Sequence, residues 1–182
     1  AKQKLENVLE AANCLRDLPD VHFCFVGEGT EKTRLEHHAR HLGLSNVRFL
    51  PLMPRESLPG LLAAADALLL NQAARVVDMV IPSKLLTYLA AGRPVVAAVP
   101  PASEAGHCLA RAGGGLVVEP ENPAQLAAAV RLLYEHRDRA RRMGLAARRF
   151  AEMHFASDQI LPRYEALFAS VAAQSRHPRR SV

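Results

Sequence analysis

The sequence predicts one α/β domain with a parallel sheet and helices on both of its faces. Short runs of β-forming or apolar residues alternate with amphipathic segments of helical periodicity, and only a few residues connect them. This alternation is typical of a parallel sheet, because each helix returns the chain to the edge where the next strand begins. The chain has 182 residues, of which 49% are hydrophobic, so it is large and apolar enough to bury one core.

Each expected element has a local reason in the sequence. Strands are short apolar or β-branched runs bounded by turn residues, within residues 21–29, 46–53, 67–71, 95–99 and 116–120. Helices carry apolar residues at every third or fourth position, within residues 4–18, 30–43, 55–66, 83–92, 100–115, 122–135, 137–153 and 160–173. The expected N-caps are Thr30, Ser57 and Asn122, Ser83 is expected to open its helix, and glycines at 43 and 92 end two helices.

Composition excludes several classes of function. Aromatic residues make up 5% of the chain and Trp is absent, which disfavours a stacking platform for nucleic acid. Cys14, Cys24 and Cys108 form no CxxC pair, and such widely spaced cysteines favour reduced thiols in a cytoplasmic protein. The eight His lack metal-ligand spacing, so no metal is expected. No apolar run reaches the roughly 20 residues of a membrane span, and the opening residues are helical rather than a signal peptide.

Ligands of parallel α/β sheets bind beyond the carboxyl ends of the strands, and two loops there carry distinctive residues. Gly27 and Gly29 flank a strand-to-helix turn, which is either a phosphate contact or a tight turn that requires positive φ. Ser83 opens a helix whose first N–H groups, on Ser83, Lys84 and Leu85, would bind a diphosphate. The alternative is that Ser83 only caps the helix and that Lys84 is solvated.

Charged residues outside these loops offer further candidates. Lys2 and Lys4 would reach an anion at the same edge, and Asp78 would bind sugar hydroxyls, although solvated side chains are the alternative for each. The net charge of +5 suits an anionic ligand or a membrane surface. Six arginines between residues 137 and 149 contribute much of it. For that helix a solvated face is favoured over membrane contact, because no bulky apolar stripe is expected to face outward.

Three stretches, taken in order, resemble the C-terminal half of retaining GT-B glycosyltransferases of family 4. They are HFCFVGEGTEKTRLEHHARHLGLSNVRFLPLMPRESLPGLLAAADALLL, PSKLLTYLAAGRPVVAA and GGGLVVEPENPAQLAAAVRLL. They are most similar to the branch found in bacterial capsule, O-antigen and exopolysaccharide clusters. The resemblance implies a Rossmann-like nucleotide-sugar-binding domain at residues 1–173 and a disordered tail at 174–182. The chain is then expected to be a piece of a longer protein that lacks the first strand and the N-terminal acceptor-binding domain.

The resemblance also assigns residues by position. The Gly27-Glu28-Gly29 turn would border the donor nucleotide, and the backbone from Leu50 to Met53 would contact the base. The segment from Ser83 to Leu85 would receive the diphosphate. Catalytic residues are expected mainly in the absent N-terminal domain, which usually supplies a His, and the last helix would cross back toward that domain.

The sequence departs from the family pattern at two places. A basic residue followed by Gly usually contacts the phosphates, but Gln3 and Lys4 occupy those positions, so Lys2 is the first choice for that role. Of the usual pair of glutamates, the second is replaced by Thr87 and the first falls next to Asp78. A Thr hydroxyl would bind a ribose hydroxyl more weakly than a carboxylate does.

The expected function is therefore the donor-binding part of a retaining glycosyltransferase. It would transfer a sugar from a UDP-sugar or GDP-sugar to a polysaccharide or lipid-linked acceptor, with no cofactor. A nucleotide-sugar epimerase of the same fold and a non-catalytic nucleotide-sugar-binding subunit are the alternatives. The expected location is the cytoplasm, with the inner face of the membrane as a further option through the basic residues.

Overall fold

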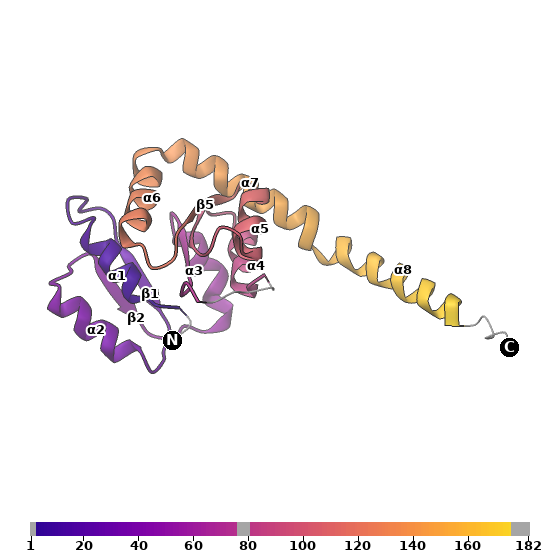
Figure 1. Cartoon of the computed structure of the whole chain (residues 1–182), viewed down its shortest axis with the longest axis horizontal. Coiled ribbons are helices and arrows are strands. Elements are labelled where there is room, and N and C mark those ends of the chain that lie inside the picture. Colours follow the sequence, from indigo (N-terminus) through magenta and orange to yellow (C-terminus); the bar gives the residue numbers. More distant parts are fainter. Residues whose placement is uncertain (1–2, 76–80, 176–182) are drawn as a thin grey trace.

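The computed structural model describes residues 3–75 and 81–175, and it has the predicted α/β architecture (Figure 1). Five parallel strands alternate with helices along the chain. The strands are β1 (Phe23–Val26), β2 (Val47–Leu50), β3 (Leu68–Asn71), β4 (Val95–Ala98) and β5 (Gly115–Val118). The helices are α1 (Glu6–Asn13), α2 (Lys32–His41), the 3-10 turn η1 (Arg55–Ser57), α3 (Leu58–Ala64), α4 (Ser83–Ala90), α5 (Glu104–Ala112), α6 (Pro123–Glu135), α7 (Arg137–Phe155) and α8 (Ser157–Ser175).

The strands form two parallel sheets. One sheet pairs β1 with β2, and the other has the order β3-β4-β5. Within the described residues no ladder joins β1 to β3, which differs from the expectation of one continuous sheet. The register pairs Val26 with Leu50 and Asn71 with Ala98, so the last residues of neighbouring strands lie at a common edge.

Alternation along the strands separates two apolar layers. Val95, Ala97 and Val99 belong to a core cluster with residues of α4, α5 and α7. Val96 belongs to a second cluster with residues of α1 and α6. Since successive side chains of a strand point to opposite faces, helices cover both faces of the β3-β4-β5 sheet. All four residues of β4 are fully buried, which identifies β4 as the central strand of that sheet.

Helix α7 packs closely against the turn that follows α4. An ideal Cβ atom on the buried Gly144 would lie 2.4 Å from the carbonyl oxygen of Gly92, so only glycine fits at this contact. Gly92 itself has φ +69°, a left-handed conformation that ends α4 as predicted. The Arg148 Nη1 group donates to the Ala90 carbonyl at 2.6 Å and so occupies a free acceptor at the end of α4.

Helix α8 extends away from the rest of the chain (Figure 1). Large apolar side chains remain exposed along it, namely Leu161, Tyr164, Leu167, Phe168 and Val171. The helix reaches Ser175, so it includes the first two residues of the expected disordered tail. Residues 176–182 of that tail lie outside the described residues.

Two of the three predicted N-caps are wrong. Only Asn122 caps as predicted, with its side chain accepting from the Gln125 N–H at 3.0 Å. Thr30 lies one residue before the actual cap of α2, and Ser57 is the last residue of η1, with a helical backbone and no side-chain capping bond. Ser83 is the first helical residue of α4, behind an extended Pro82.

Candidate functional site

Most of the predicted site residues lie at the carboxyl edges of the two sheets. Gly27 follows β1, Leu50 ends β2, and α4 begins after the segment that leaves β3. The Gly27 N–H donates to the Leu50 carbonyl at 3.2 Å, so these two predicted residues are in direct contact. Lys2 and Asp78 lie outside the described residues.

The start of α4 presents two backbone N–H donors, on Ser83 and Lys84, that bond to no described residue. Ser83 and Lys84 are exposed, whereas Leu85 is fully buried. The Leu85 N–H already donates to the Pro82 carbonyl at 2.9 Å, so the prediction that it would be free is wrong. The reason is that the first turn of the helix is tight enough for a bond between residues three apart. The first N–H groups of the helix, on Ser83 and Lys84, therefore remain for an anion.

Thr87 lies one turn after Ser83, and its side chain is exposed. Its Oγ1 hydroxyl donates to the Ser83 carbonyl at 3.2 Å, within the same helix. A hydroxyl that donates in this way still has lone pairs that accept a hydrogen bond. The geometry therefore suits Thr87 as an acceptor for a ligand hydroxyl.

The glycine turn after β1 is only partly explained by backbone conformation. Gly27 has φ +133°, which residues with a side chain rarely adopt. Gly29 has no positive φ, and no atom lies within 4 Å of a Cβ placed on it. Glu28 forms an ion pair with Lys32, with 2.6 Å between Oε1 and Nζ. The turn therefore needs a glycine at 27, while the open space at 29 is compatible with close approach of a ligand.

The predicted base-contacting segment is exposed beyond β2. Leu50 is half-buried, and Met53 is 40% exposed. The backbone from Leu50 to Met53 thus lies at the same edge as the glycine turn. This is the position expected of a segment that contacts a ligand through its backbone.

Some cations near this edge form ion pairs with carboxylates. Arg34 forms ion pairs with Glu6 and Glu31. Burial alone would raise the pKa of Glu6, but its backbone hydrogen bond and the Arg34 guanidinium together hold that pKa below its usual value. Lys84 forms no ion pair with a described residue, so its charge is available to a ligand.

A pair of buried asparagines at the same edge was not predicted. Asn7 Nδ2 donates to Asn71 Oδ1 at 2.7 Å, and Asn71 Nδ2 donates to the carbonyls of Gln3 and Lys4. Both asparagines are buried, with 7% and 6% of their surfaces exposed. The available sequence signal was an Asn that ends the apolar run of β3 and another on the apolar face of α1.

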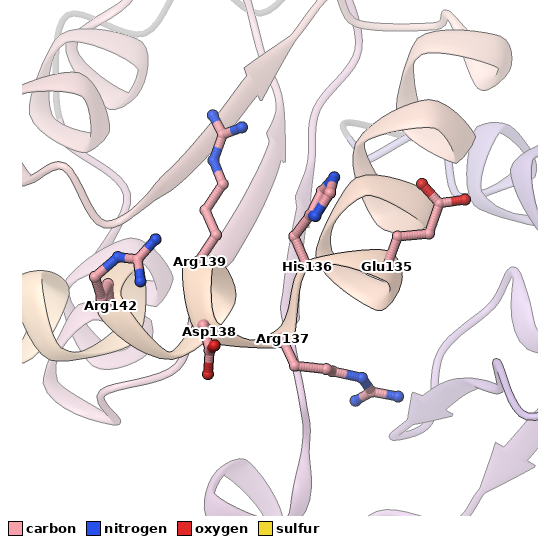
Figure 2. Close-up of a pocket in the computed structure, with 6 residues that line it drawn as sticks. All are labelled: Glu135, His136, Arg137, Asp138, Arg139 and Arg142. Atoms are coloured by element: carbon pink, nitrogen blue, oxygen red, sulfur yellow. The ribbon is translucent and has the colours of Figure 1, made fainter.

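An open hollow of about 560 Å³ lies between α6 and α7, away from the predicted site. Its lining is charged and consists of Glu135, His136, Arg137, Asp138, Arg139 and Arg142. Figure 2 shows Arg137 and Arg139 pointing in different directions, so the cations do not converge on one point. Arg137 pairs at 3.2 Å with Asp66, which precedes β3, so the hollow lies at the amino edge of the sheet.

The described residues contain neither a metal-binding cluster nor a membrane-spanning helix. No cluster of three or more His, Cys, Asp or Glu in residues 3–75 and 81–175 has the arrangement of a metal site. No helix in the same ranges combines the length and apolarity needed to cross a bilayer.

Comparison with known proteins gives a consistent family. The model of the family "Glycosyl transferases group 1" matches residues 1–150. WcaI of Escherichia coli (strain K12), which is named as a colanic acid biosynthesis glycosyl transferase, is 38% identical over 167 residues. That match covers 90% of this chain and 39% of WcaI, so the chain spans about two fifths of this relative.

Solved structures share the fold. WaaG, a glycosyltransferase involved in lipopolysaccharide biosynthesis, is 26% identical with a TM-score of 0.70, over 91% of this chain and 43% of WaaG. HepE of Anabaena, solved with UDP-glucose, is 20% identical with a TM-score of 0.76, over 92% of this chain and 45% of HepE. Because the family model covers most of the chain, the protein described here belongs to the group 1 glycosyl transferases.

Proposed function

We propose that this chain binds the nucleotide-sugar donor in a retaining glycosyltransferase of family 4. The observation that carries the proposal is the start of α4, where the exposed Ser83 and Lys84 combine helix N–H groups with a lysine charge that pairs with no carboxylate of the described residues. Family membership supports it. HepE, which shares the fold, was solved with UDP-glucose, and this supports a UDP-sugar or GDP-sugar as donor.

The proposed chemical role is stabilisation of the leaving diphosphate. When the bond between sugar and diphosphate breaks, negative charge accumulates on the diphosphate oxygens. Preorganised N–H groups at a helix start and a lysine ammonium stabilise that charge more in the transition state than in the ground state. This role requires no cofactor from the chain, and catalytic side chains are proposed to lie mainly in an acceptor-binding domain.

Further donor contacts belong to the same proposal. Thr87 would accept from a ribose hydroxyl, Lys2 would contact the phosphates, and Asp78 would contact the sugar. The Gly27–Gly29 turn and the backbone from Leu50 to Met53 would border the nucleotide. Gly27 and Leu50 are already joined by a hydrogen bond, which supports their assignment to one surface.

The acceptor is proposed to be a polysaccharide or lipid-linked glycan, held by an N-terminal domain of the same protein. WcaI and WaaG are named for the biosynthesis of colanic acid and lipopolysaccharide, which supports this acceptor class. The exposed apolar residues of α8 would pack against that domain. A further strand between β1 and β3 would join the two sheets into one.

Binding of nucleotides to the wild-type chain tests the proposal directly. Isothermal titration calorimetry with UDP, GDP and their sugars should show binding, and NMR amide shifts should move at Ser83–Thr87. Lys84→Ala should weaken binding about tenfold or more, because it removes a charge-assisted contact. Arg141→Ala removes an equally exposed cation from α7 and should leave affinity unchanged. Absence of binding by every nucleotide would overturn the proposal.

Two other activities make different predictions for the complete protein. A nucleotide-sugar epimerase would convert a UDP-sugar to its epimer without an acceptor, which product analysis detects. A non-catalytic binding subunit would support polysaccharide formation even with Lys84→Ala and Thr87→Ala together. The proposed transferase releases a sugar only to an acceptor and loses transfer with both changes.

We also propose that the exposed face of α7 contacts an anionic membrane surface at the inner face of the membrane. The structure corrects the expectation that no bulky apolar residue faces outward there, because Leu145 and Met153 are 52% and 58% exposed. Arg142 and Arg149 share that exposed side and form no ion pair with a described residue. Arginines beside exposed apolar side chains are typical of helices that lie on anionic lipid.

Vesicle sedimentation tests this location. The protein should bind vesicles that contain phosphatidylglycerol and not vesicles of phosphatidylcholine alone, and salt should weaken the binding. Arg142→Glu with Arg149→Glu should abolish it, while Arg34→Glu on α2 should not. Equal binding of all three proteins would refute a membrane role for α7.

A further inference from the structure

Two buried asparagines hold the two ends of α1. At the start of the helix, Asn71 Nδ2 donates to the Lys4 carbonyl at 3.0 Å and also to the Gln3 carbonyl. At the end of the helix, Asn46 Nδ2 donates to the Ala12 carbonyl at 2.9 Å. Asn46 and Asn71 are equally buried, with 6% of each exposed. They differ in place, because Asn46 precedes β2 at the amino edge whereas Asn71 ends β3 at the carboxyl edge.

The turn that Asn71 holds is strained. Lys4 has φ +44°, a left-handed conformation that is strained for a residue with a side chain. Such a conformation persists only where surrounding contacts favour it. The two carbonyls that accept from Asn71, those of Gln3 and Lys4, belong to this turn. Asn7 Nδ2 donates to Asn71 Oδ1 and so orients the Asn71 amide. The contact therefore selects one conformation of the turn before α1.

The segment after β3 is held from a second side. The Gln72 N–H donates to the Ala98 carbonyl at 3.0 Å, and the Ala74 N–H donates to Glu121 Oε1 at 3.0 Å. Glu121 has φ +54°. Among the described residues, Lys4 and Glu121 are the two non-glycine residues with positive φ, and both are next to this segment. Strained backbone of this kind clusters at functional sites.

We propose that Asn71 is a positioning residue for the donor diphosphate, an inference that rests on the function proposed above. Asn71 fixes the Gln3–Lys4 turn against the end of β3, and Leu70 of that strand shares a buried core cluster with Leu85 at the start of α4. It thereby sets the spacing between the turn before α1 and the Ser83–Lys84 helix start. Without its amide donor, the turn relaxes to negative φ and that spacing is lost.

Asn71→Asp tests the inference with Asn46→Asp as matched control. Each change keeps the size and shape of the side chain. In each, a buried amide N–H group that donates to a backbone carbonyl at one end of α1 is replaced by an oxygen acceptor. Both variants should lose thermal stability. Only Asn71→Asp should weaken UDP binding, by about tenfold, when affinity is measured at a temperature where circular dichroism shows both variants folded. Asn46→Asp should stay within about twofold of wild type, since distant sites act independently.

Asn7→Ala provides a second measurement that does not depend on a buried charge. It removes the group that orients Asn71 but leaves the Asn71 donor and the Lys4 carbonyl in place, so its loss of affinity should be smaller than that of Asn71→Asp. In the complete enzyme, Asn71→Asp should raise KM for the donor and leave KM for the acceptor unchanged.

The outcomes separate this inference from the function on which it rests. If wild type binds UDP and Asn71→Asp binds equally well, the positioning role is overturned while donor binding stands. An equal loss in Asn46→Asp also overturns it, because the effect would then be general destabilisation. If wild type binds no nucleotide, the proposed function fails and the inference fails with it. If Asn71→Asp does not fold, wild-type affinity in Asn7→Ala overturns the inference.

Discussion

Gly144→Ala should destabilise the protein even though alanine is the better helix former. Within a helix, replacing Gly by Ala ordinarily stabilises by up to about 1 kcal/mol. At position 144, however, the new Cβ would lie 2.4 Å from the Gly92 carbonyl oxygen, about 1 Å inside the ordinary contact distance of 3.4 Å. It would also lie 3.1 Å from the Gly92 carbonyl carbon and 3.3 Å from Arg93 Cα, so backbone must move. Overpacking of this kind costs about 1–3 kcal/mol.

The net loss should be about 1–2 kcal/mol, which lowers Tm by about 2–8 °C for a chain of this size. Gly60→Ala is the control, because Gly60 lies within α3 and no atom is within 4 Å of its added Cβ. It should gain a few tenths to about 1 kcal/mol. Thermal unfolding followed by circular dichroism measures both. A Gly144→Ala protein as stable as the Gly60→Ala protein would refute the packing argument.

Three further predictions concern single groups. Gly27→Ala should destabilise by about 1–3 kcal/mol in denaturant unfolding, because alanine is strained at φ +133°, whereas Gly29→Ala should be neutral. Burial raises the pKa of the Cys108 thiol, so 5,5′-dithiobis(2-nitrobenzoate) should label the exposed Cys14 and Cys24 in the native protein and reach Cys108 only after unfolding. The hydrogen bond from Arg131 holds the pKa of Asp17 below 3.8, so its contribution to stability is present above that pH and lost as pH falls through the folded pKa. Arg131→Ala should return that pKa toward 3.8 in an NMR titration, and an unchanged value would contradict the role of Arg131.

Local patterns predicted the succession of elements and one of the three N-caps. The apolar runs at residues 67–71 and 95–99 became β3 and β4, because fully buried strands need continuous apolar residues. Asn122 caps α6 as predicted. Asn is favoured at the N-cap and Pro at the first helical position, and both preferences depend only on the first turn of the helix. The caps at Thr30 and Ser57 were wrong, because an extra helical turn precedes each helix and residue type alone does not reveal it.

Contacts between distant residues could not be predicted. Asn7 and Asn71 are 64 residues apart, so no pattern in a short window joins them. At the start of α4, the sequence indicated that Ser83 and Lys84 would offer N–H groups to an anion. It did not indicate that the Pro82 carbonyl would accept from the Leu85 N–H. Nor could composition indicate that Leu145 and Met153 would be exposed, because that depends on which side of α7 meets α4 and α5.

Each end of helix α1 accepts a hydrogen bond from an asparagine next to a strand, and the two strands belong to different sheets. Asn46 leads into β2 of one sheet, and Asn71 closes β3 of the other. Since no ladder joins β1 to β3 in the described residues, α1 helps to hold the two sheets at a fixed distance and rotation, together with the core that Phe23 and Val96 share. Inserting one residue into its eight would lengthen it by about 1.5 Å and turn one end by about 100° relative to the other. One asparagine would then lose its carbonyl partner, so the length of α1 is as tightly constrained as its sequence.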